Sequence, residues 1–117
     1  MKRTLYTLIA TALLLSCSGH EVRNSIKVLD DVESYIQERP DSALSVLEGI
    51  DKSVLNSREL KARHGLLLSM ALDKNFIDLT SDSLIAPVVE YYEGTKDYDH
   101  LFKAYYYLGR IYHNAGR

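Results

Sequence analysis

Cys17 is the only cysteine of the chain, and it directly follows the most apolar stretch of the sequence. A thiol can be alkylated by a diacylglyceryl group to give a stable thioether, and cleavage between Ser16 and Cys17 frees an amine that can also be acylated. Each buried methylene contributes about 0.8 kcal/mol, so two or three acyl chains hold a protein at a membrane far more firmly than one. We therefore interpret Cys17 as a lipid attachment site. The alternatives are a cysteine in an ordinary secretory signal and a buried structural thiol.

The segment before Cys17 is typical of a signal peptide. Met1-Lys2-Arg3 is basic, and an uncharged, largely apolar stretch fills residues 4–16. This stretch is shorter than the roughly 20 apolar residues of a membrane-spanning helix, so we expect residues 1–16 to be cleaved off. Leu14-Leu15-Ser16-Cys17 resembles the lipobox of bacterial lipoproteins. The resemblance implies a protein of the bacterial cell envelope, anchored by lipid and facing the periplasm, with inner and outer membrane left open.

The other residues that could do chemistry form no catalytic or metal-binding pattern. The four histidines (His20, His64, His100 and His113) are not spaced as metal ligands, and no second cysteine can join them. The acidic pairs at 30–31 and 97–99 are better explained as solvated faces or helix caps than as general acids and bases. A glycine-rich phosphate loop and a Gly-x-Ser-x-Gly motif are also missing. We therefore predict no enzyme, no metal site and no cofactor.

Charge and composition exclude further classes of protein function. Without Lys2 and Arg3, 12 of the 14 basic residues remain against 16 acidic ones, a formal charge of −4. That balance argues against nucleic-acid binding, which needs a basic face. Residues 17–24 are expected to be a polar tether behind the lipid, and residues 25–117 one small domain.

The domain is expected to be all-α, with about five helices. Apolar residues recur at three- and four-residue spacing, and proline, glycine and cap-forming residues interrupt them. We expect a first helix from Ser25 that ends at Pro40, a second capped by Asp41, and a third from Asn56 or Ser57 to Leu72, with a turn at 73–75. The fourth spans 83–93, with a kink at Pro87 or a start near Ala86, and the fifth begins near Asp97 or Asp99.

An ordered series of motifs resembles the N-terminal part of bacterial tetratricopeptide repeat (TPR) lipoproteins. The series is Pro40-Asp41-Ser42-Ala43-Leu44, Lys61-Ala62-Arg63, Asp82 to Ile85 with Tyr91-Tyr92, and Tyr105 to Tyr112. The resemblance implies stacked antiparallel helical hairpins in a TPR-like solenoid. The interval from Ala62 to Ala104 is longer than the usual repeat of about 34 residues, which leaves HEAT-like hairpins as an alternative.

In a TPR hairpin the first helix lines the concave groove, and the resemblance places the last helix of this chain in that role. Its groove-facing set would be Lys103, Tyr106, Arg110, His113 and Asn114, which are donors around an aromatic ring. They suit a peptide carboxylate or an acidic side chain, although an ordinary polar helix face explains them too. The matching face of the third expected helix is more apolar (Lys61, His64, Leu68 and Ala71), so a mixed groove is an equal alternative. The tyrosines Tyr91, Tyr92, Tyr105, Tyr107 and Tyr112 are expected to pack rather than to bind a ligand.

Together these features predict a membrane-anchored, TPR-like module for protein–protein interaction, with a protein or peptide partner of unknown identity. The rival interpretation is the truncated N-terminal sensor region of a membrane-bound TPR regulator of transcription or signalling. Because the last expected helix lacks a pairing helix, we also expect the chain to be a fragment or a truncated product.

Overall fold

The computed structural model describes residues 23–116, and this part of the chain is all-helical, with five helices and no strand. A first helix covers residues 23–35, so Arg23 and Asn24 of the expected tether are helical. The helices α2 (Pro40–Gly49), α3 (Arg58–Lys74), α4 (Ala86–Glu93) and α5 (Tyr98–Asn114) follow, with a 3-10 turn, η1 (Lys52–Val54), between α2 and α3. The predicted signal peptide, Cys17 and most of the expected tether lie outside the described residues.

Side-chain caps set the starts of the two longest helices. The Ser57 hydroxyl accepts a hydrogen bond from the backbone N–H of Leu60 at 3.1 Å, so α3 is capped by Ser57 and not by Asn56. The Asp97 carboxylate accepts from the backbone N–H of His100 at 3.2 Å and caps α5. Of the two starts expected for each of these helices, the structure selects the one at Ser57 and the one at Asp97.

Both prolines lie at helix starts. α2 begins at Pro40, and no side chain caps it, so the expectation that Asp41 is the cap is wrong. Proline is well suited to the first helical turn because the N–H that it lacks has no partner there. Pro87 lies in the first turn of α4, which begins at Ala86 and therefore needs no kink. The start near Ala86 is confirmed.

The end of α3 lies later in the chain than the sequence indicates. The helix runs through Asp73 and Lys74, so the turn expected at 73–75 falls on Asn75 and Phe76. The Asn75 amide donates to the backbone carbonyls of Ala71 at 2.7 Å and of Pro40 at 2.9 Å, which ties the end of α3 to the start of α2. Phe76 takes a positive φ of 61° to leave the helix.

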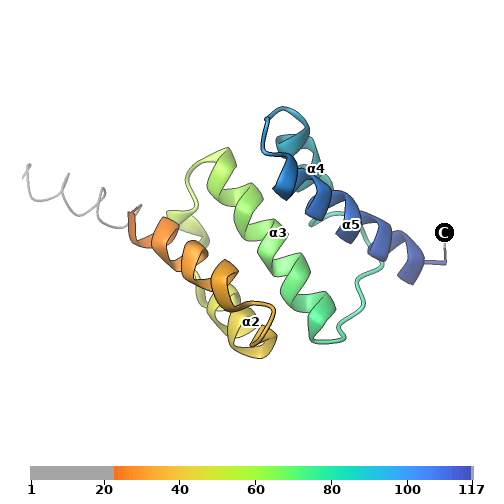
Figure 1. Cartoon of the computed structure of the whole chain (residues 1–117), viewed down its shortest axis with the longest axis horizontal. Coiled ribbons are helices and arrows are strands. Elements are labelled where there is room, and N and C mark those ends of the chain that lie inside the picture. Colours follow the sequence, from red (N-terminus) through yellow and green to blue (C-terminus); the bar gives the residue numbers. More distant parts are fainter. Residues whose placement is uncertain (1–22, 117) are drawn as a thin grey trace, which may run out of the picture.

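The central helix is α3, which packs against α2, α4 and α5. In Figure 1 the first helix, α3 and α5 run side by side in the same general direction, while α2 and α4 are the return legs between them. Leu66, Leu67 and Ala71 of α3 are fully buried. Tyr92 and Tyr107 are buried as expected, whereas Tyr105 is 43% exposed and its hydroxyl donates to Glu93 at 2.8 Å.

Candidate functional site

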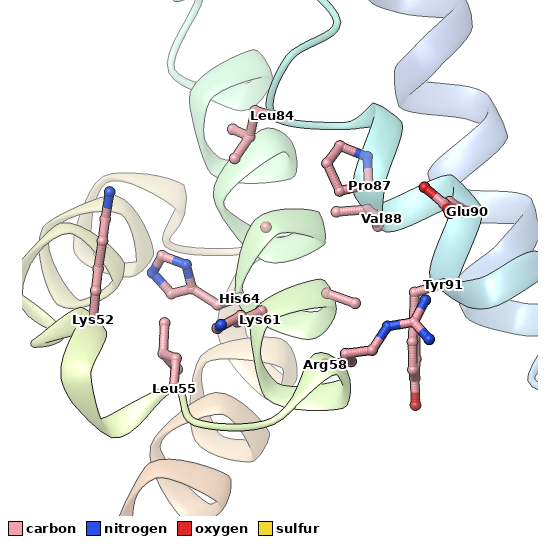
Figure 2. A pocket seen from close by; sticks show the side chains of 12 residues that line it. Lys52, Leu55, Arg58, Lys61, His64, Leu84, Pro87, Val88, Glu90 and Tyr91 are labelled. Atoms are coloured by element: carbon pink, nitrogen blue, oxygen red, sulfur yellow. The ribbon is translucent and has the colours of Figure 1, made fainter.

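A groove of about 670 Å³ lies between η1, α3 and α4 (Figure 2). We call it the α3 groove, because α3 forms its base and contributes the most residues. This volume falls within the range of ordinary ligand sites, which is about 300–1,000 Å³. The residues that line it are Lys52, Leu55, Arg58, Lys61, Ala62, His64, Gly65, Leu84, Pro87, Val88, Glu90 and Tyr91.

The floor of the α3 groove is apolar because α4 packs very closely on α3. A Cβ added at Gly65 would lie only 2.8 Å from Cγ2 of Val88 and 3.8 Å from Cδ1 of Leu84. Only glycine permits this approach. Pro87 in the first turn of α4 adds apolar surface beside Val88. The bare helix at Gly65 thus determines both the packing of α4 and the depth of the groove.

The rim of the α3 groove is cationic. Lys52, Arg58 and Lys61 are exposed and line it, and none of the three forms an ion pair with another described residue. Glu90 is the one carboxylate among the lining residues. The Arg58 guanidinium carbon lies 5.9 Å from the centre of the Tyr91 ring, at the edge of cation–π range. The rim therefore presents an excess of positive charge over an apolar floor.

His64 lines the groove from α3 but is almost fully buried. Its Nε2 lies 2.9 Å from the backbone carbonyl oxygen of Leu47 in α2. Because a carbonyl only accepts, Nε2 carries the proton and donates. In the neutral ring Nδ1 is then the acceptor. His64 accordingly fixes α3 to α2, and its polar contribution to the groove is one ring nitrogen.

These groups suit binding. Lysine and arginine heads recognise carboxylates through charge-assisted hydrogen bonds, and an apolar floor accepts an aliphatic or aromatic side chain. The lining contains neither serine, threonine nor cysteine as a nucleophile. The arrangement is suited to a ligand that combines negative charge with apolar surface.

The five residues predicted for a peptide groove share one side of α5, but three of them are engaged within the chain. Lys103 Nζ pairs with Asp99 at 3.0 Å, Arg110 Nε pairs with Asp73 of α3 at 3.2 Å, and the Asn114 amide donates to the Leu79 carbonyl at 3.0 Å. Tyr106 and His113 are exposed. The hollow beside Arg110 and Asn114 measures only about 10 Å³, less than a bound water occupies. A carboxylate could enter there only if the loop at Leu79 moved.

A second polar cluster joins the first helix, α3 and α5. Arg63 Nη2 lies 2.6 Å from Asp30 and 2.7 Å from Glu33, and His100 lies 2.6 Å from Glu33 and 2.5 Å from Asp97. Carboxylates only accept, so both ring nitrogens of His100 must be protonated and the imidazole is charged. With both nitrogens occupied, His100 has none free to act as a base. The cluster is a connection between helices.

The electrostatics of this cluster agree with its geometry. Burial raises the pKa of Glu33, but hydrogen bonds from Arg63 and His100 outweigh burial and hold the pKa below its usual value. Burial lowers the pKa of His100, but the bonds to Asp97 and Glu33 outweigh that effect and raise it. Burial raises the pKa of Asp97, but the side-chain and backbone hydrogen bonds from His100 together outweigh burial and hold the pKa below its usual value. Each charge therefore stabilises its neighbours.

The α3 groove was not among the sites predicted from sequence. Lys61 and His64 follow each other on one helix face, which is a local signal, but Lys52 and Tyr91 join them only through tertiary contact. Among residues 23–116 no group of three or more histidine, cysteine or acidic residues is placed to hold a metal ion. Within the same range no helix is both long and apolar enough to cross a membrane.

Comparison of the chain with protein-family models, with curated proteins and with solved structures found no match in any of the three. The resemblance to TPR lipoproteins therefore rests on the sequence motifs. The predicted lipid site at Cys17 and the predicted cleavage site at Ser16 lie outside the described residues.

Proposed function

We propose that this protein is a non-catalytic, TPR-like interaction module, held at a bacterial membrane by lipid on Cys17, that binds an acidic peptide segment in the α3 groove. The segment would place an apolar side chain on the floor of the groove and carboxylates at its rim. The lipid would keep the module at the periplasmic face of the envelope.

One observation carries this proposal: three cations surround an apolar floor without an ion-pair partner in residues 23–116. The described ion pairs all involve other cations, namely Arg63, His100, Lys103 and Arg110, which are bound to carboxylates within the chain. Unpaired cations on one rim raise the local potential and attract anionic ligands. Arg58 adds a planar fork of donors that matches a carboxylate geometrically.

The helix arrangement supports the TPR-like part of the proposal. Three long helices lie side by side with shorter return helices between them (Figure 1), and α3 contacts both α4 and α5. Gly65 allows α4 to approach α3 closely, so neighbouring helices are packed tightly at this point. The long connection between α3 and α4 keeps HEAT-like hairpins as the structural alternative.

A peptide titration tests the proposed site. The probe is a labelled peptide in which glutamate alternates with leucine, and its matched control carries lysine in place of glutamate. We expect the acidic peptide to bind with an affinity that decreases as salt is added. Its binding should shift the backbone NMR signals of Arg58, Lys61 and Tyr91. The triple variant Lys52→Glu, Arg58→Glu, Lys61→Glu should lose binding at least tenfold.

The matched control is the variant Lys27→Glu, Lys74→Glu, Lys96→Glu, which changes the net charge equally at positions that do not line the groove. It should retain most of the affinity. An equal loss of affinity in both variants would mean that net charge, and not the α3 groove, determines binding. Signals that shift elsewhere on the protein, and not at the groove, would contradict the proposed site.

A further inference from the structure

The face of α5 that points away from the core is apolar and open. Phe102 is 69% exposed, Tyr106 59%, Tyr98 57% and Tyr105 43%. Helical spacing of three, four and seven residues places these rings and Gly109 on one stripe. Ala104, Tyr107 and Ile111 occupy the opposite, buried side. We call this stripe the α5 face; it shares only Tyr106 and His113 with the peptide groove predicted from sequence.

Gly109 is the position on the α5 face that has no side chain. A Cβ added there would meet nothing within 4 Å, in contrast to Gly65, where the same Cβ would meet Val88. At Gly65 a neighbouring helix uses the missing side chain to approach closely. At Gly109 the same opening in the helix surface is exposed, and the most exposed ring of the stripe, Phe102, lies two turns away.

We propose that two copies of this chain associate through their α5 faces, antiparallel about a two-fold axis between Tyr105 and Tyr106. In that register Phe102 of one copy lies over the partner's Gly109, and Phe102 of the partner subunit lies over Gly109. Tyr105 meets the partner's Tyr106. A large ring and an empty position, seven residues apart on one stripe, complement themselves only when the second helix runs in reverse.

The charges on α5 permit this contact. The stripe carries no acidic or lysine side chain, and its one titratable base is His113 at its end. Lys103 and Arg110 flank the stripe, and each is already paired, with Asp99 and Asp73. Glu93 accepts a hydrogen bond from the Tyr105 hydroxyl at 2.8 Å, so one carboxylate of each copy lies beside the stripe, while the stripe itself sets no like charges against each other.

The exposed area indicates a weak dimer. An aromatic side chain buries about 150–250 Å² in full, so four rings that are each about half exposed offer roughly 450 Å² per copy. A standard interface needs about 800 Å² per partner. The expected dissociation constant is therefore micromolar or weaker. Attachment of both copies to one membrane by lipid would raise their effective concentration.

Sedimentation equilibrium of the full chain in density-matched detergent, from micromolar to millimolar concentration, tests the proposal. We expect a reversible monomer–dimer equilibrium. Phe102→Ala should weaken it at least tenfold because it removes the ring. Gly109→Leu should weaken it as much because it fills the empty position, although Gly109 has no neighbour in the monomer. Phe76→Ala, at a 91% exposed ring outside α5, is the matched control and should change nothing.

The double variant Phe102→Gly, Gly109→Phe decides the register. It exchanges the ring and the empty position, so an antiparallel two-fold pairing again places each introduced ring over the partner's introduced glycine and restores the dimer. Circular dichroism melting confirms that each variant is folded. A chain that stays monomeric at millimolar concentration overturns the proposal. That result is expected if the α5 face binds a helix of a different protein. A folded double variant that stays monomeric overturns the antiparallel register.

Discussion

The imidazole Nε2 of His100 lies 2.6 Å from carboxylate Oε1 of Glu33, although 67 residues separate them in the sequence. The first helix and α5 are thereby joined through one charged hydrogen bond. Arg63 of α3 binds the other oxygen of the same carboxylate at 2.7 Å. Glu33 thus connects three helices, and its side chain is only 23% exposed. Such a bond contributes more than a surface ion pair, because the groups are already partly withdrawn from water.

We expect the stability of the fold to decrease as the pH rises above the usual histidine value of about 6.5. The pKa of His100 is raised in the folded state, so its contribution is complete below that value and is lost as the pH rises through the folded pKa. His100→Gln should lower the free energy of unfolding by about 1 kcal/mol near pH 6 and by much less near pH 9. Urea unfolding at a series of pH values measures both.

The control for this experiment is His113→Gln, because the His113 side chain is exposed at the end of the same helix. It removes a histidine from the same helix without touching the bonds of His100 to Glu33 and Asp97, so the loss of stability assigned to His100 should remain in it. Glu33 and Asp97 have lowered pKa values, so their contribution is present at neutral pH and is lost as the pH falls through the folded values. If the His100→Gln variant still loses stability at alkaline pH, another group causes that loss.

Two glycines on helices of equal length should respond to alanine with opposite signs. Gly65→Ala would place Cβ 2.8 Å from Val88 Cγ2, and we expect the free energy of unfolding to fall by about 1–2 kcal/mol. Gly109→Ala meets nothing within 4 Å, so the higher helix propensity of alanine should raise it by about 0.5–1 kcal/mol. Thermal melts of dilute protein measure the pair. Stabilisation by both changes would mean that α4 does not pack closely on α3.

The helices could be predicted well because their boundaries depend on local chemistry. Ser57 and Asp97 are cap formers directly before apolar repeats, and Pro87 limits the start of α4 through its own ring. The Asp41 cap failed because Pro40 can itself occupy the first helical position. At the late end of α3, the Asn75 amide donates to the Pro40 carbonyl, which is 35 residues distant. Sequence patterns carry no information on such a partner.

The α3 groove could not be predicted for the same reason. Its depth depends on the approach of Val88 to Gly65, and its rim on the placement of Lys52 in η1 beside α3. On α5, the resemblance to TPR repeats placed Arg110 and Asn114 on the expected groove side of the helix. It did not reveal that Asp73 and Leu79 occupy these groups. Which cations stay free for a ligand is decided by tertiary contacts.

Phe76 should be a favourable position for glycine. Its φ of 61° is a left-handed conformation, which costs an ordinary residue roughly 1–2 kcal/mol, and its ring is 91% exposed and loses little packing when removed. After the entropic cost of glycine, we expect Phe76→Gly to raise the free energy of unfolding by about 0.5–1 kcal/mol. Ile77→Gly, next to it and without a positive φ, is the control and should destabilise. Chemical denaturation of both variants distinguishes backbone strain from a loss of exposed apolar surface.

The proposed lipid anchor leads to a clear biochemical expectation at Cys17. In a bacterial host, the full chain should incorporate radiolabelled palmitate and fractionate with membranes. Cys17→Ser should abolish both, because a hydroxyl cannot form the thioether and two or three acyl chains supply the membrane affinity. Ser16→Ala is the matched control, since it keeps a small residue before the cysteine, and it should be labelled normally. Labelling that persists in Cys17→Ser would contradict the lipoprotein interpretation, and membrane association without labelling would assign the anchor to the uncleaved residues 1–16.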